Sequence, residues 1–151
     1  MKQKIFLAAD HAGFEMKEFI KKSLLKEGHD IVDKGALTYD KEDDYPDFII
    51  PAAIEVVKHQ NSKGIIFGGS GQGEANAANK VDGIRAVVYN CENLDLIKLS
   101  REHNDANVLS IGARFMSNEH ALEAIRLWLS ANFSRDKRHV RRIEKIAKFE
   151  K

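Results

Sequence analysis

The chain has 151 residues, of which 43% are hydrophobic and 31% charged, and its formal net charge is +1. This length suffices for a hydrophobic core, and we expect residues 1–151 to form a single domain. The near-neutral charge gives no electrostatic reason to expect nucleic acid or an anionic membrane as a partner. The single cysteine, Cys91, cannot form an internal disulfide, and no apolar stretch approaches the ~20 residues that span a bilayer. These features predict a cytoplasmic protein.

Short apolar segments alternate with longer amphipathic ones along the chain. The amphipathic spacing predicts a helix that carries Pro51 in its first turn, where the missing N–H costs little, and another that opens at about Glu74. Strands that are apolar throughout and alternate with helices favour a parallel sheet covered on both faces. We therefore predict a three-layer α/β/α, Rossmann-like domain with a five-stranded parallel sheet and a C-terminal helix. The predicted strands are residues 5–9, 31–32, 65–67, 84–89 and 108–111, and the other helices are residues 14–25, 93–102, 118–130 and 138–149.

Polar and flexible groups follow the ends of these strands. In open parallel sheets, ligands bind beyond the carboxyl ends of the strands. The sequence therefore predicts that these groups gather at one edge of the sheet. They are Asp10 and His11 after the first strand, residues 68–74 after the third, Cys91 and, one helix later, His103 and Asn104 after the fourth, and Gly112 and Arg114 after the fifth.

The segment Gly68-Gly69-Ser70-Gly71-Gln72-Gly73 joins a strand to a helix. Such a turn can direct several backbone N–H groups into one concavity, which would bind a phosphate, a carboxylate or an enediolate. The alternative is a tight turn without a ligand. A dinucleotide site is disfavoured, because the segment follows the third strand and carries Glu74 where the last glycine of that fingerprint belongs.

Glu74 itself has two interpretations. A glutamate in the first turn of a helix is favoured by the helix dipole and needs no further role. A carboxylate beside a cluster of amide donors also suits proton transfer next to a carbonyl group, because the amides hold the oxyanion while the carboxylate takes the proton.

The histidines and the last helix carry similar alternatives. Asp10-His11 suits either a strand-end turn or a site, and His103 lies at a helix end, where a cation is favoured structurally. Asp10, His11 and His103 together could be imagined to hold a metal, but the chain has no closely spaced ligand pair, and we expect neither a metal nor a cofactor. Arg138 and Arg142 share one helix face and suit a phosphate, unless this face is simply solvated.

Taken together, several segments resemble the family of type B ribose-5-phosphate isomerases, which is grouped with the galactose-6-phosphate isomerase subunits. The resemblance runs in order over nearly the whole chain. The segments that carry it are residues 9–13 (ADHAG), 44–47 (DYPD), 68–74 (GGSGQGE), 77–80 (AANK), 83–86 (GIRA), 100–109 (SREHNDANVL) and 138–139 (RH).

The family has two versions of the glycine segment. Many members carry a cysteine base in a Cys-Gly-Thr-Gly context, and the matching position here is Gly68. The other branch reads Gly-Gly-Ser-Gly-x-Gly-Glu and uses the glutamate. This chain resembles the second branch, which implies that Glu74 is the base and that Cys91 is not the family cysteine.

The resemblance also implies roles for the remaining residues. His103, aided by Asp10, would open the furanose ring, while Ser70 and the amides of Gly71 and Gly73 would hold the enediolate. Asn104 would contact sugar hydroxyls. The phosphate would be bound by His11, Arg114, Arg138 and Arg142. In the family the site is completed across a dimer, with His103 and the arginines of the last helix reaching the partner's glycine segment, so we expect a homodimer or a dimer of dimers.

The expected activity is therefore the metal-independent interconversion of ribose 5-phosphate and ribulose 5-phosphate through an enediolate. Two alternatives remain open from the sequence. The substrate could be a six-carbon sugar phosphate, such as galactose 6-phosphate or allose 6-phosphate. The chain could also be a non-catalytic module that binds phosphosugars, although such a module would have no need of a base beside the anion site.

Overall fold

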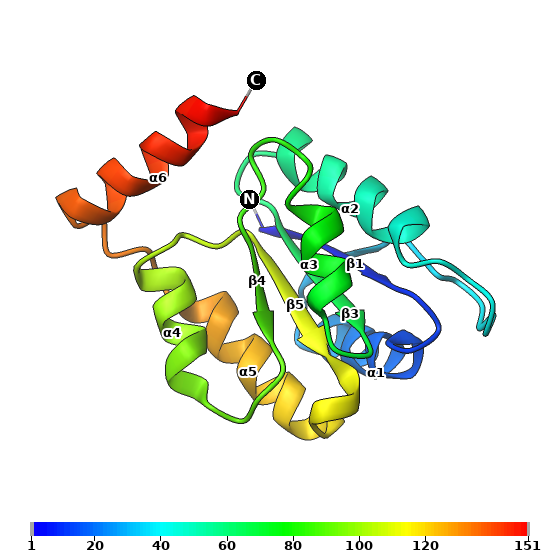
Figure 1. The fold of residues 1–151 in the computed structure, drawn as a ribbon. Coiled ribbons are helices and arrows are strands. Elements are labelled where there is room, and N and C mark those ends of the chain that lie inside the picture. Colours follow the sequence, from blue (N-terminus) through cyan, green and yellow to red (C-terminus); the bar gives the residue numbers. More distant parts are fainter. Residues whose placement is uncertain (1, 151) are drawn as a thin grey trace.

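The computed structural model describes residues 2–150 and contains one parallel sheet (Figure 1). The strand order is β2-β1-β3-β5-β4, and every neighbouring pair is parallel. This confirms the predicted five-stranded parallel sheet. The strands are β1 (Lys4–Ala9), β2 (Asp30–Asp33), β3 (Lys63–Gly68), β4 (Ala86–Tyr89) and β5 (Val108–Gly112).

Helices cover both faces of the sheet. Buried side chains of α1, α4 and α5 pack in one apolar cluster, whereas those of α2 and α3 pack in a second cluster on the opposite face. The predicted three-layer, Rossmann-like arrangement is confirmed. The helices are α1 (Phe14–Lys26), α2 (Pro46–Lys58), α3 (Gln72–Ala78), α4 (Leu94–Glu102), α5 (Asn118–Ser130) and α6 (Lys137–Phe149), with a 3-10 turn η1 (Ala113–Phe115).

The central strands show why they are apolar throughout. Successive side chains of a strand point to opposite faces of the sheet. In β1, Ile5, Leu7 and Ala9 belong to the cluster under α1 and α5, while Phe6 and Ala8 belong to the cluster under α2. A strand covered on both faces therefore needs apolar residues at odd and even positions alike.

The strand order also fixes where a site can form. The chain leaves β1 for α1 on one face of the sheet, and leaves β3 for α3 on the other face. Since β1 and β3 are neighbours, with Ala9 paired to Phe67, their exits diverge and leave a crevice at their carboxyl ends. Gly68 is in turn paired with Gly112 of β5, so three strand ends meet there.

Helix α6 lies outside the three layers and extends from the body of the protein (Figure 1). Its apolar side is incompletely covered, with Ile146 58% exposed and Phe149 90% exposed. Near its end, the Glu150 carboxylate accepts hydrogen bonds from the N–H of Gly83. An apolar surface of this kind on a projecting helix suits contact with another chain.

Several predicted boundaries differ from the structure. Helix α2 begins at Pro46, so Pro51 lies inside the helix and not in its first turn. Pro46 takes the early position that tolerates a missing N–H, and the carbonyl left without a partner by Pro51 belongs to the exposed Asp47. Helix α3 begins two residues before Glu74, and β4 is shorter than residues 84–89.

None of the helices among residues 2–150 is long and apolar enough to cross a bilayer.

A buried ion-pair network fastens α1 to the end of β2. Lys17 is fully buried, and its Nζ lies 2.7 Å from Asp33 Oδ2 and 2.9 Å from Glu18 Oε1. Lys21 Nζ lies 2.8 Å from the same Asp33 oxygen. Burial alone would raise the pKa of Asp33, but the hydrogen bonds from Lys17 and Lys21 lower it overall. Glu18 Oε1 also accepts from Lys21 at 2.9 Å, so Asp33 and Glu18 are both shared by the two lysines, and Asp33 is the nearer of the two to Lys17.

Replacing Asp33 with Asn should lower the free energy of unfolding by about 2 kcal/mol at neutral pH, because a buried lysine loses its nearest counter-charge. The pKa of Asp33 is lower in the folded protein than in the unfolded chain, so its contribution is complete above about pH 4 and is lost as pH falls further. Urea unfolding should therefore show a deficit at neutral pH that shrinks in acid. The exposed Asp30 of the same strand provides the control Asp30→Asn, and equal deficits in both variants would contradict the assignment.

Candidate active site

The crevice at the carboxyl ends of β1, β3 and β5 contains much of the predicted site. Asp10 and His11 follow β1, the glycine segment follows β3, and Arg114 lies in the turn after β5. The Arg114 N–H donates to the carbonyl of Gly69, which ties the third of these loops to the second. The sequence prediction that these groups converge is correct for this part of the site.

The glycine segment is a turn whose carbonyl groups are held from behind. Gly71 has a left-handed backbone with φ of 82°, and its carbonyl accepts from the Ser110 hydroxyl at 2.6 Å. Asn90 Nδ2 donates to the carbonyl of Ser70 at 3.2 Å. Within residues 2–150, no group accepts from the N–H of Ser70 or Gly71. The turn therefore offers free amide donors beside the start of α3, as an anion site requires.

Glu74 lies in the first turn of α3 and is only 4% exposed. Burial raises the pKa of its carboxyl group, and the nearby Asp10 carboxylate raises it further. Its carboxylate lies over Gly68, where a built Cβ atom would overlap the carboxylate atoms. A larger residue at position 68 would therefore displace Glu74 from its present position.

Asp10 is also buried, and its position is set by the backbone. Its Oδ1 atom accepts from the N–H of Ala12 at 3.0 Å and of Gly13 at 3.4 Å, where the chain turns from β1 into α1. The structural interpretation of Asp10 as a turn residue is thus correct. The same carboxylate is close enough to Glu74 to raise the pKa of that group, so the structural role does not remove it from the site.

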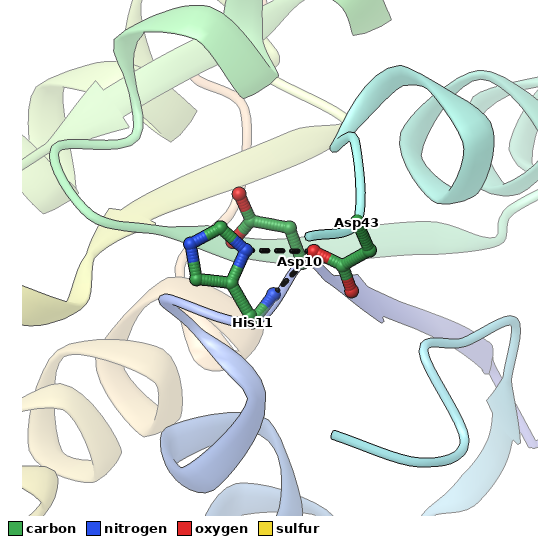
Figure 2. A group of neighbouring side chains, drawn as sticks. All are labelled: Asp10, His11 and Asp43. Atoms are coloured by element: carbon green, nitrogen blue, oxygen red, sulfur yellow. Dashed lines mark hydrogen bonds and ion pairs between the residues drawn. The ribbon is translucent and has the colours of Figure 1, made fainter. Parts of the chain in front are cut away.

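His11 is paired with Asp43, a residue that the sequence did not single out (Figure 2). Asp43 Oδ1 lies 2.7 Å from His11 Nδ1 and also accepts the His11 backbone N–H at 2.9 Å. The hydrogen bond from the His11 ring to the Asp43 carboxylate is the main reason that the pKa of His11 is raised. Asp43 Oδ2 is buried, and none of residues 2–150 donates to it. This pair fixes the orientation of the imidazole and favours its cationic form.

A pocket of about 330 Å³ opens beside His11. Arg114 lines it, with its guanidinium group against the backbone of Gly69, and Tyr39 forms another wall. On the other side of the glycine segment, a Cβ on Gly73 would lie 2.8 Å from Cζ of Tyr45. The sequence does not predict Tyr39 or Asp43 as site residues, because residues 38–44 have only the composition of a polar loop. Tyr45 belongs to the 44–47 segment that resembles the family, but the resemblance implies no role for it.

The group of side chains that could hold a metal ion differs from the one considered in the sequence, because Asp43 takes the place of His103. One ligand atom from each of Asp10, His11 and Asp43 lies within 4.8 Å of the others, as Figure 2 illustrates. His103 is not part of this group. The hydrogen bonds between His11 and Asp43 account for the proximity of those two residues without an ion, although Asp43 Oδ2 has no donor among residues 2–150. Asp10, His11 and Asp43 are the residues that would hold a divalent cation.

Four predicted site residues lie elsewhere in the chain's own fold. Helix α4 starts at the carboxyl end of β4 and runs back, so its end carries His103 and Asn104 to the amino ends of the strands. The carbonyl of Asn104 there accepts from Arg85 Nε, one residue before β4. His103 stacks on the buried His139 of α6, with ring centroids 4.2 Å apart, and α6 also carries the exposed Arg138 and Arg142. The expectation that His103 and Asn104 join Glu74 at one edge of the same sheet is therefore wrong.

The pairing of His11 with Asp43 predicts a measurable titration. Asp43→Asn should lower the pKa of His11, because the amide supplies neither the charge nor the acceptor strength of the carboxylate. Imidazole NMR chemical shifts followed against pH would measure the change. Asp44→Asn, in the neighbouring exposed residue, is the matched control, and an unchanged His11 pKa in Asp43→Asn would refute the pairing.

Comparison with known proteins agrees with this geometry. The profile of the family described as Ribose/Galactose Isomerase matches residues 5–146. Ribose-5-phosphate isomerase B of Mycobacterium tuberculosis strain H37Rv is 42% identical over 98% of this chain and 90% of its own length. The Escherichia coli K12 protein of the same name is 38% identical over 98% and 97% of the two chains.

Solved structures show the same fold. The crystal structure of ribose-5-phosphate isomerase B from Mycoplasma genitalium, with bound ribulose 5-phosphate, superposes with a TM-score of 0.93 at 37% identity and covers 99% of this chain and 97% of that one. The Clostridium thermocellum ribose-5-phosphate isomerase B structure gives a TM-score of 0.91 at 39% identity, over 97% of both chains. The chain therefore belongs to the ribose/galactose isomerase family.

Proposed function

We propose that this protein is an aldose–ketose isomerase that interconverts ribose 5-phosphate and ribulose 5-phosphate. The observation that carries the proposal is the buried Glu74 carboxylate beside the free amides of the glycine turn, in a chain of this family. The related Mycoplasma structure holds ribulose 5-phosphate, which supports the choice of substrate. The free, exposed Cys91 suits a reducing compartment, and we assign the protein to the cytoplasm.

The reaction is a proton shift between two carbons. After the sugar ring opens, Glu74 removes the proton from the second carbon, and the electron pair moves onto the carbonyl oxygen to give an enediolate. Ser70 and the amides of Gly71 and Gly73 would hold the negative oxygen, and the lack of an acceptor for the N–H groups of Ser70 and Gly71 among residues 2–150 supports this role. The protonated carboxyl group then returns the proton to the first carbon, while the hydroxyl proton on the oxygen of the second carbon passes to the oxygen of the first, which leaves a ketone at the second carbon. A carboxylate whose pKa is raised by burial suits this role, because it accepts a proton more readily than an ordinary carboxylate.

Position 68 supports the choice of Glu74 over a cysteine base. In the branch of the family that uses cysteine, the thiol stands at this position. Here the Glu74 carboxylate lies where a side chain of residue 68 would begin. The two possible bases would therefore reach the same region of the site, one from the end of β3 and the other from the start of α3. A glycine at position 68 makes room for the glutamate.

The phosphate end of the substrate fits the pocket beside His11. Arg114 supplies a guanidinium group there, and the raised pKa of His11 increases the share of cationic imidazole at neutral pH. Two cationic groups in this pocket and the Glu74 carboxylate elsewhere in the same crevice would orient a sugar phosphate between them.

We also propose that a second copy of the chain completes the site. His103, Asn104, Arg138 and Arg142 lie at the amino ends of the strands or on α6, so they cannot act at Glu74 of their own chain in this conformation. The projecting α6, with its exposed Ile146 and Phe149, offers the apolar surface that such contact would bury. His103 would then assist ring opening and the arginines would bind phosphate in the partner's site.

Turnover of ribose 5-phosphate by the purified protein in excess EDTA is the direct test of the proposed function. We expect interconversion with ribulose 5-phosphate at an undiminished rate, because no step requires a metal. Loss of the activity in EDTA, with recovery on adding a divalent cation, would assign a metal to the Asp10, His11 and Asp43 group. Turnover of galactose 6-phosphate or allose 6-phosphate alone would replace the pentose with a hexose.

Glu74→Gln should lower turnover by about 100-fold or more, because the amide cannot accept the proton but keeps the shape of the side chain. The measurement is steady-state kcat, with circular dichroism as the check on folding. Glu119→Gln provides a control, since Glu119 also lies in the first turn of a helix, is exposed and is remote from the turn of residues 68–73. Near-normal kcat in Glu74→Gln would exclude this residue as the base.

A complementation experiment tests the shared site. Glu74→Gln and His103→Ala should each be nearly inactive, whereas a mixed dimer would contain one site with both defects and one intact site. Equal mixing with subunit exchange should then restore about a quarter of wild-type activity, since half of the dimers are mixed and each has one working site. No recovery, despite mass-spectrometric detection of mixed dimers, would show that each chain supplies its own His103.

A further inference from the structure

A second polar pocket, of about 390 Å³, lies at the opposite edge of the sheet from Glu74. It is bounded by the first residue of β3, the end of α2, and the loops that precede β4 and β5. Lys63 begins β3 and Gly68 ends it, so the two edges are about 16 Å apart at the usual rise per residue of a strand. The proposed isomerase mechanism uses no residue of this pocket.

Lys63 is the unusual residue of this pocket. It is only 7% exposed, and its Nζ atom lies 5.1 Å from the centre of the Trp128 ring. Among residues 2–150, Asp105, the acidic residue of this pocket, forms its ion pairs with Arg85 and Arg101 and not with Lys63. The indole N–H of the fully buried Trp128, next to the Lys63 amine, has no acceptor within these residues. A buried donor without an acceptor is uncommon in a folded protein.

The other cations around the pocket are already engaged. Arg101 Nη1 donates to Asp105 at 2.9 Å and to the carbonyl of Ala106 at 2.7 Å. Arg85 Nη2 donates to the carbonyl of Asp105 at 2.8 Å and lies 3.3 Å from its carboxylate. Asp105 is the one acidic residue among those that line the described pocket, and both arginines share it. The pocket is therefore net positive, and Asp105 forms ion pairs with the two arginines and none with Lys63.

The surroundings of Lys63 disfavour the charged form of its amine. Burial lowers the pKa of its amine to about 8, and the neighbouring Arg101 contributes to the decrease. An anion in the pocket would reverse both causes, because it would supply an acceptor and a counter-charge at once. A ligand of this kind would therefore stabilise the charged form of the Lys63 amine.

We propose that this pocket is a second anion-binding site, which takes a small molecule bearing a phosphate or carboxylate group with Lys63 as its principal donor. Arg101 and Arg85 surround the ligand with positive charge while their own hydrogen bonds to Asp105 hold them in place. The proposal is independent of the proposed isomerase activity, since the pocket and the crevice at Glu74 lie at opposite edges of the sheet.

The single tryptophan of the chain reports on this site directly. Because Lys63 Nζ lies over the Trp128 ring, an anion bound to the amine changes the electric field at the indole. Inorganic phosphate titrated into the wild-type protein at about pH 7 should give a saturable change in Trp128 fluorescence. Above the pKa of about 8 the neutral amine binds anions poorly, so at about pH 9.5 the apparent affinity should be weaker by about tenfold or more.

Three variants locate the response. Lys63→Met keeps a long side chain over Trp128 and should abolish the saturable change, while Lys58→Met, in an exposed lysine at the end of α2, should leave it intact. Arg114→Gln, at the carboxyl edge of the sheet, should also leave it intact. A flat trace in the wild-type protein, an equal response at both pH values, or a response lost in Arg114→Gln and kept in Lys63→Met would overturn the proposal. The pH comparison uses only wild-type protein, so it holds even if Lys63→Met fails to fold.

Discussion

The parallel pairing of β1, β3 and β5 is the constraint on which the rest of this structure depends. Ala9 is paired with Phe67, and Gly68 with Gly112, so three strands end at one level. Because the chain leaves β1 and β3 toward opposite faces of the sheet, the space beyond their ends stays open. Asp10, His11, the glycine turn and Arg114 are near one another for this reason, although more than a hundred residues separate the first from the last in sequence.

Within this crevice, burial changes the acidity of Glu74. Its carboxylate is shielded from water and lies over Gly68, at the turn whose carbonyl groups accept hydrogen bonds from Ser110 and Asn90. Burial and the nearby Asp10 raise the pKa of Glu74, whereas Asp43 raises the pKa of His11. The same crevice thus contains a carboxyl group and an imidazole whose pKa values are both raised by their surroundings.

The two buried lysines at opposite ends of the sheet differ in whether a carboxylate pairs with them. Lys17 is fully buried but pairs with Asp33 and Glu18, so its charge is compensated within the fold. Lys63 is also buried and lies over Trp128. Asp105, the acidic residue among the described residues that line its pocket, pairs with Arg85 and Arg101 instead. Buried charges in proteins are normally paired, and this contrast is what gives Lys63 its significance.

The sequence by itself determined the elements and the class of fold. Strands such as residues 5–9 and 65–67 are apolar at every position because both faces of the sheet are covered, and that pattern is visible without coordinates. The groups that directly follow the strands were also predictable, since they need only the rule that parallel strands end at one edge. The resemblance to a known family added the choice of Glu74 among the possible bases.

Only the tertiary structure decided the contacts that depend on direction and distance. The sequence shows that His103 follows a helix, but the direction of α4 determines that this residue returns to the amino edge, away from Glu74. It offers no sign that Asp43 would reach His11 across 32 positions, because side-chain pairing between loops leaves no periodic signal. Nor could it distinguish Lys17 from Lys63, since a lysine's partner is set by what the fold packs around it.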